Sequence, residues 1–123
     1  MTAQAHPSHR VTRAVNQIHA LLDDLSDVSL WSMGTDETAH TLTEITRAGS
    51  RLAELEARVA SHASAVGVAE QVGATSVANW WAHQTRMTRT EAHRKTRLAD
   101  GLDHHPAVQA GLRTGDLLVD QAR

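Results

Sequence analysis

The sequence predicts an all-α fold, a long antiparallel helical hairpin followed by a helix-turn-helix-like cluster of short helices. Apolar residues recur at spacings of three and four over two long stretches, which is the period of an amphipathic helix. The 123 residues include no Phe, no Tyr and only three Trp, and they lack the runs of β-branched and aromatic residues that favour strands. Capping residues and glycines divide the second half into short segments.

The first half is expected to contain a loose leader and two helices. Residues 1–7 have no apolar stretch, so they predict a leader rather than a signal peptide. A helix is expected from about Ser8 to Leu25, with an apolar stripe formed by Val11, Val15, Ile18, Leu22 and Leu25. A longer helix is expected from about Asp36 to Ala65, with a stripe formed by Leu42, Ile45, Gly49, Leu52, Glu56, Val59, Ala63 and Val66, which Leu55 widens.

The stripe of the longer helix needs a partner, because its spacing is that of a coiled-coil seam. The simplest partner is the first helix, folded back antiparallel to give a hairpin over residues 8–72. A second copy of the chain is the other candidate. The segment VGVAEQVGAT, which contains two glycines, is expected to end the helix and to link it to residues 73–123.

The region 73–123 begins with two expected helices. Thr75 or Ser76 can cap a helix that reaches about Arg86. After a turn of about two residues, Thr88 and Glu91 form the S/T-x-x-E capping box of a helix that reaches about residue 102. This is the spacing of a helix-turn-helix unit, whose second helix reads DNA in many proteins.

Two further helices are expected at the end of the chain. Pro106 is well placed to begin a short helix that ends at Gly115. Another helix begins near Val119, and the sequence stops at Arg123. One turn of helix does not stabilise itself, so the region 73–123 is expected to be truncated at its C-terminus.

Basic residues are concentrated in the second expected helix of this region. Residues 1–74 carry five Arg and nine acidic residues, whereas residues 75–123 carry seven Lys or Arg and five acidic residues. At 100° per residue, the helix after Thr88 places Ala92, Thr96 and Ala99 on one side and its arginines on the other. Arginine suits phosphate oxygens and guanine edges. The candidate DNA-binding residues are Arg86, Arg89, His93, Arg94 and Arg97.

The same features have a second interpretation, a solvated face on an ordinary helical bundle. Arg86 stands where many helix-turn-helix units have glycine, which suits a left-handed turn. Lys95 projects toward the packed side, so its amine must extend to solvent. Trp80 and Trp81 are expected to pack in the core, with base stacking or ligand binding as the alternative.

No catalytic site, cofactor or metal site is expected. The string DHH, which ends in His104 and His105, occurs in metal-dependent phosphoesterases, but no carboxylate cluster accompanies it. The chain has no cysteine, no glycine-rich phosphate loop and no nucleophile elbow. It has no apolar run long enough to span a membrane, and the absence of cysteine is compatible with the cytoplasm.

The string GATSVANWWAHQTRMTRTEAHRKTRLADGLDHHPAVQAGLRTGDLLVDQAR contains an ordered series of short motifs. They are Gly73-Ala74-Thr75, Trp81-Ala82, the block of Thr88, Glu91 and Ala92, Arg97-Leu98-Ala99, Gly115, and Asp120-Gln121-Ala122-Arg123. In this order, and with the acidic, leucine-spaced helix before them, they resemble the family called domain of unknown function 222, or the thirteen-E-twelve repeat family. Its members are the helical N-terminal regions of bacterial HNH endonucleases. The resemblance covers most of residues 20–123.

The resemblance implies an all-helical module joined to, or descended from, an HNH nuclease. Such nucleases use a ββα-metal site in which a histidine activates water, and none of that site occurs in these 123 residues. The family's catalytic residues therefore have no counterparts here. We expect a non-catalytic module that binds DNA or assists a nuclease. The alternative is a protein–protein interaction module that dimerises, or docks an HNH nuclease domain, through the stripe of residues 42–66.

Overall fold

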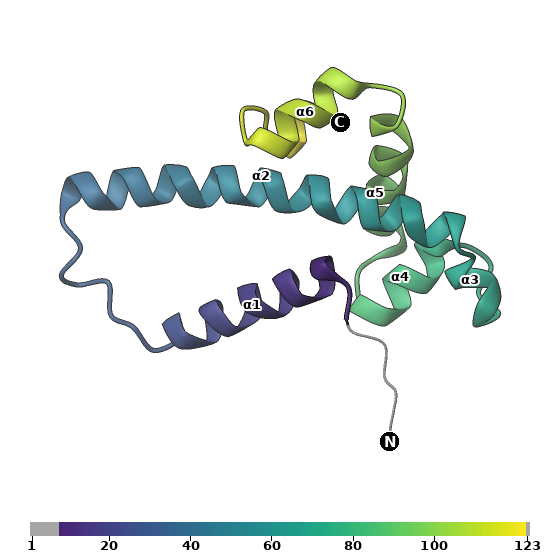
Figure 1. The fold of residues 1–123 in the computed structure, drawn as a ribbon, viewed down its shortest axis with the longest axis horizontal. Helices are drawn as coiled ribbons and strands as arrows, with labels where there is room; N and C mark the ends of the chain where they lie inside the picture. Colours follow the sequence, from purple (N-terminus) through teal and green to yellow (C-terminus); the bar gives the residue numbers. More distant parts are fainter. Residues whose placement is uncertain (1–7, 123) are drawn as a thin grey trace. The chain divides into compact units, whose positions relative to one another are not determined.

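The computed structural model describes residues 8–122, which contain seven helices and no strand (Figure 1). The predicted all-α fold class is therefore confirmed, whereas the predicted leader, residues 1–7, lies outside the described residues. The chain divides into two compact units, residues 1–35 and 36–123, which are treated separately below. The helices are α1 (Arg10–Leu25), α2 (Thr35–Ala65), α3 (Val68–Gln71), α4 (Val77–Thr85), α5 (Arg89–Leu102), α6 (Pro106–Thr114) and α7 (Val119–Ala122).

The first unit contains α1 and the loop that follows it. His9 caps the helix, because its Nδ1 accepts a hydrogen bond from the backbone N–H of Val11 at 3.0 Å. No residue of α1 is buried, and the side chains of Leu22 and Leu25 are exposed. Trp31, in the loop, is 93% exposed and so does not pack in a core. The antiparallel hairpin of the first two helices stays a prediction.

Helix α2 buries a face that the apolar pattern did not indicate. Its buried residues are small or polar, namely Ser50, Glu54, Ala57 and Ala60. At 100° per residue, the centre of this face lies roughly 125° around the helix from the centre of the predicted stripe. The large side chains of that stripe are exposed, among them Leu42, Ile45, Leu52, Val59 and Val66. Elements α3–α7 therefore pack on one side of α2 and leave the stripe uncovered within this unit.

The core of the second unit contains residues from both predicted regions, 8–72 and 73–123. Ala57 and Ala60 of α2 pack with Ala99 and Leu102 of α5 and with Leu112 of α6. Leu112 is the largest fully buried apolar side chain among the described residues. The cluster also contains three alanines, and five larger, partly buried side chains pack against it, namely Trp81, Leu98, Val108, Leu117 and Val119. Small side chains let the helices approach closely.

A buried carboxylate connects α2 to α6. The side chain of Glu54 is 1% exposed, and its oxygens lie 2.8 Å from Nε of Arg58 and 3.4 Å from Nε of Arg113. Nε2 of Gln109 donates a hydrogen bond to Glu54 at 3.2 Å. Buried charges are tolerated when they are paired and hydrogen-bonded in this way. Arg113 and Gln109 both belong to α6, so Glu54 fixes that helix on α2.

The segment between α2 and α4 contains a short helix that the sequence analysis assigned to a linker. Gly67 adopts a left-handed conformation with φ 73° and begins α3. Ala69 of α3 is 1% exposed, so burial of this residue accounts for a helical turn where two glycines indicated a loop. Gly73 is also left-handed, with φ 75°, and it ends the segment before α4.

The end of the chain follows the predicted order. Pro106 stands in the first turn of α6. Backbone N–H groups of the first turn have no acceptor within the helix, so a proline there costs no hydrogen bond. Gly115 ends α6 with φ 82° and is buried. A Cβ at this position would meet Cβ and the carbonyl oxygen of Arg47, in α2, at 3.1 and 3.2 Å. The chain therefore needs glycine here both for the turn and for the close approach to α2.

Candidate nucleic-acid interface

Helices α4 and α5 form two consecutive capped helices joined by a tight turn. The hydroxyl of Ser76 accepts a hydrogen bond from the N–H of Asn79 at 3.1 Å and caps α4. The hydroxyl of Thr88 accepts one from the N–H of Glu91 at 3.1 Å and caps α5. Both predicted caps are confirmed. The turn is formed by the three residues 86–88, one more than the sequence predicted.

The turn begins with Arg86 in a left-handed conformation, with φ 58° and ψ 25°. It is the one non-glycine residue with positive φ among the described residues. The sequence analysis placed Arg86 where related units have glycine, and the conformation agrees with that comparison. The backbone N–H groups of Arg86 and Met87 both bond to the carbonyl oxygen of Ala82, so the turn is closed by the end of α4.

The apolar side of α5 packs on α4, as predicted. Ala92 is fully buried between Ala78 and Ala82, and Met87 from the turn covers this contact. Further along α5, Ala99 and Leu102 join the core with α2 and α6. Because one side of α5 is occupied along its whole length, the opposite side is fixed in orientation by these contacts.

The predicted DNA-binding residues share the outer side of this pair of helices. Four of them lie within an arc of about 140° on α5, and all four are exposed. They are Arg89, His93, Arg94 and Arg97. Arg86, also exposed, stands in the turn just before them. Arg94 forms an ion pair with Glu91 at 2.7 Å. No ion pair of Arg97 is found among the described residues. The surface formed by these five residues is called the basic face below.

Lys95 does not belong to the basic face, in agreement with the prediction that it turns toward the packed side. Its amine lies 2.9 Å from Oε1 of Glu56 and 5.6 Å from the centre of the Trp81 ring. A lysine over a tryptophan ring gains a cation–π attraction. Lys95 therefore joins α5 to α2, and its charge is already compensated within the protein.

The two adjacent tryptophans have different surroundings. Trp81 packs against the core of α2, α5 and α6, which confirms the prediction for this residue. Trp80 is half-buried and borders a cavity of about 620 Å³ together with Asn79, His83 and Arg89. Trp80 thus has one side open to this cavity, beside one of the basic-face arginines.

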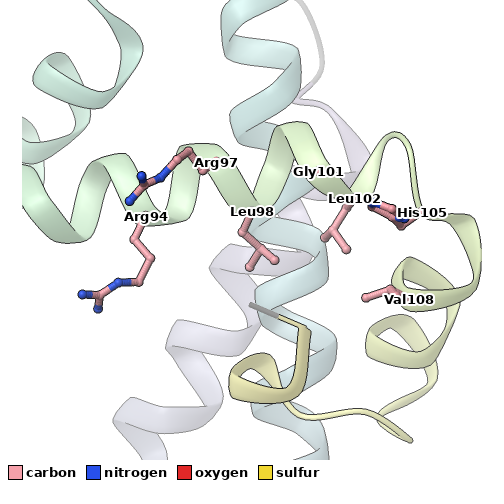
Figure 2. A pocket seen from close by; sticks show the side chains of 7 residues that line it. All are labelled: Arg94, Arg97, Leu98, Gly101, Leu102, His105 and Val108. Atoms are coloured by element: carbon pink, nitrogen blue, oxygen red, sulfur yellow. The ribbon is translucent and has the colours of Figure 1, made fainter.

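A second cavity, of about 410 Å³, lies at the other end of the basic face (Figure 2). The sequence did not predict this cavity, because residues of both α5 and α6 form it. Leu98 and Leu102 of α5 and Val108 of α6 supply apolar walls. The guanidinium groups lie at one end and His105 at the other (Figure 2). The described residues that line it are Arg94, Arg97, Leu98, Gly101, Leu102, His105 and Val108.

Comparison of the chain with protein-family models, curated proteins and solved structures gave no match. The described helices include none with the length and apolar character needed to cross a membrane. Within the described residues, no three His, Cys, Asp or Glu side chains are grouped so that they could hold a metal ion.

The left-handed turn residue gives the first testable prediction. Replacing Arg86 by glycine is expected to raise the free energy of unfolding by about 0.5–1 kcal/mol, because glycine adopts positive φ without steric cost. Arg86→Ala is the matched control, since it removes the same charge but keeps the strain. Urea denaturation followed by circular dichroism measures both. An equal effect of the two variants would show that the backbone conformation is not the cause.

Proposed function

We propose that the chain is a non-catalytic helical module that binds DNA through the basic face, as a part or an accessory of an HNH-endonuclease-like protein. The observation that supports this most is the exposure of Arg89, Arg94 and Arg97 on one side of a helix whose other side is packed. Exposed cationic groups on a rigid helix suit a regular array of phosphates. The turn of three residues before α5 matches the spacing of helix-turn-helix proteins.

The charges of the basic face are available to an anionic partner to different degrees. Arg97 has no ion-pair partner among the described residues, so it can bind phosphate without breaking a contact. Arg94 must exchange Glu91 for phosphate or share its guanidinium between them, and exposed ion pairs of this kind contribute little. Arg89 and His93 precede Arg94 along the helix. Arg97 and Arg94 are therefore expected to make the main contacts.

Replacing Arg94 and Arg97 together tests whether the basic face binds DNA. The double variant Arg94→Ala, Arg97→Ala is expected to weaken binding to a mixed-sequence duplex by at least about ten-fold at low salt, because two phosphate contacts are lost. Fluorescence anisotropy of labelled duplex measures it. The matched control is Arg10→Ala, Arg13→Ala, which removes the same charge from α1 and should retain most of the affinity. Unchanged binding by the Arg94/Arg97 variant would contradict the proposal.

The resemblance to the nuclease-associated family supports the accessory role. None of the residues of an HNH site is present in the chain, so we expect no cleavage of DNA by the purified chain with Mg²⁺. Cleavage above the level of a mock purification would contradict the non-catalytic assignment. DNA binding without cleavage would leave positioning of a nuclease on DNA as the expected role.

A second candidate function is protein–protein association through the stripe of α2. The exposed side chains of Leu42, Ile45 and Leu52 favour it, because contiguous apolar surface of this kind marks interaction sites. Multi-angle light scattering tests it. A dimer that dissociates in the Ile45→Glu, Leu52→Glu double variant would support association through this stripe. A monomer at high micromolar concentration would contradict self-association.

A further inference from the structure

We propose that the cavity between α5 and α6 binds a small amphipathic anion, a molecule with one carboxylate and a short aliphatic body. The cavity and its ligand go beyond DNA binding, although two arginines belong to both sites. Four features of the cavity carry the proposal. They are its apolar walls, the absence of an acidic residue from the lining that the structure describes, the two guanidinium groups at one end, and the free space at Gly101.

The apolar walls indicate the body of the ligand. Leu98, Leu102 and Val108 lie next to one another in Figure 2 and come from two different helices. Leu102 is buried and the other two are half-buried, so the walls are held by the core rather than by mobile side chains. A volume of about 410 Å³ is in the range of small-molecule sites, which are mostly apolar with a few polar groups.

The polar groups indicate the charge of the ligand. Among the described residues, no Asp or Glu lines the cavity, whereas Arg94 and Arg97 do. Their guanidinium groups lie at the end toward the start of α5, so the head of the ligand is expected there (Figure 2). A carboxylate accepts two hydrogen bonds from a guanidinium in a favourable fork geometry. Arg97 is the expected main partner, since Arg94 already contacts Glu91.

Gly101 provides a variant that closes the cavity without disturbing the fold. It stands on α5 between Leu98 and Leu102, and a Cβ added there would meet no atom within 4 Å. A leucine at this position would project into the cavity. It would also favour the helix, because glycine is the poorer helix former by nearly 1 kcal/mol. Gly101→Leu is therefore expected to fold at least as stably as the natural chain.

The shared arginines give the site a consequence for DNA binding. A carboxylate held by Arg97 and Arg94 occupies groups that the basic face offers to phosphate. Ligand and DNA are then expected to compete, and the cavity would let a small molecule control the affinity for DNA. This consequence rests on the proposed function, whereas binding of the anion itself does not.

Titration of the full chain with octanoate, below its micelle concentration, tests the site. Two-dimensional ¹H–¹⁵N NMR is expected to show saturable shifts at residues 97–108. Gly101→Leu, checked for folding by its own spectrum, should weaken binding at least ten-fold, and so should replacing octanoate by uncharged 1-octanol. Failure to saturate, equal binding to Gly101→Leu, or equal binding of octanol would overturn the proposal.

A competition experiment with DNA distinguishes failure of this proposal from failure of the proposed function. Octanoate is added to the natural chain with labelled duplex, and Gly101→Leu serves as the control. If the chain binds DNA and octanoate and the two compete, both proposals are supported. If octanoate binds while DNA does not, the cavity stands and the DNA proposal fails. If DNA binds and octanoate does not, the inference about the cavity is overturned.

Discussion

Replacing Glu54 by alanine is expected to lower the free energy of unfolding by about 3 kcal/mol. Removing one member of a buried ion pair leaves its partners without compensation, which costs about 3–5 kcal/mol when they too are buried. Here Arg58 and Arg113 are about half exposed and can regain water, so the lower end of that range applies. Gln109, which is half-buried, loses its acceptor as well.

Urea denaturation of Glu54→Ala and Glu56→Ala tests this prediction. Glu56 is two residues away on the same helix and also pairs with a cation, but its side chain is 41% exposed. Exposed ion pairs contribute at most about 1 kcal/mol, so Glu56→Ala should be only slightly destabilised. Equal losses in the two variants would mean that burial of Glu54 does not decide its contribution.

The second large effect on stability is expected at Gly115, where the end of α6 approaches α2 closely. Gly115→Ala is expected to destabilise the fold by about 2–3 kcal/mol. Positive φ costs a non-glycine residue about 1 kcal/mol or more, and the new Cβ would also press on Cβ and the carbonyl oxygen of Arg47 at 3.1 and 3.2 Å. Backbone atoms of a helix cannot move aside as a flexible side chain does.

Gly73 separates the two contributions to this effect. It has a similar φ, 75°, but a Cβ there would meet nothing within 4 Å. Gly73→Ala should therefore cost about 1 kcal/mol, from backbone strain alone. Thermal unfolding of both variants gives the comparison. If Gly115→Ala costs no more than Gly73→Ala, the contact with Arg47 is not tight in solution.

Helix boundaries in the second half could be predicted because local signals determine them. These signals begin or end a helix through the neighbouring backbone, so they can be recognised without knowing the tertiary fold. They are the capping hydroxyls of Ser76 and Thr88, the proline at the start of α6 and Gly115 at its end. The exposed side of α5 could be predicted for a similar reason. Its apolar and basic residues are separated around the helix, and burial follows that separation.

The core face of α2 could not be predicted, because its residues carry no apolar signal. Two of the partners of the buried Glu54, Gln109 and Arg113, come from α6, 55 and 59 positions further along the chain. Ala57 and Ala60 gave no signal either, because alanine occurs on exposed helix faces as well as on buried ones. The large side chains of the same helix, such as Leu42 and Ile45, indicated a different face. Whether they meet α1 or a second copy depends on contacts that periodicity alone does not specify.

The cavity between α5 and α6 was also beyond sequence reasoning. Its lining joins Arg94 and Leu98 to Val108, which lies on a different helix and at no helical spacing from them. The basic character of the site could be predicted from α5, whereas its apolar walls appear only when α6 is placed. The charged surface could thus be predicted from the sequence, whereas the concave site beside it could not.

The salt dependence of DNA binding tests the central claim, that the basic face contacts phosphates, most directly. Anisotropy titrations of a mixed-sequence duplex over a series of salt concentrations give the slope of log affinity against log salt. About four phosphate contacts predict a slope near −4, and the double variant Arg94→Ala, Arg97→Ala should fall to about −2. Identical slopes for the two proteins, or no binding at low salt, would contradict the claim.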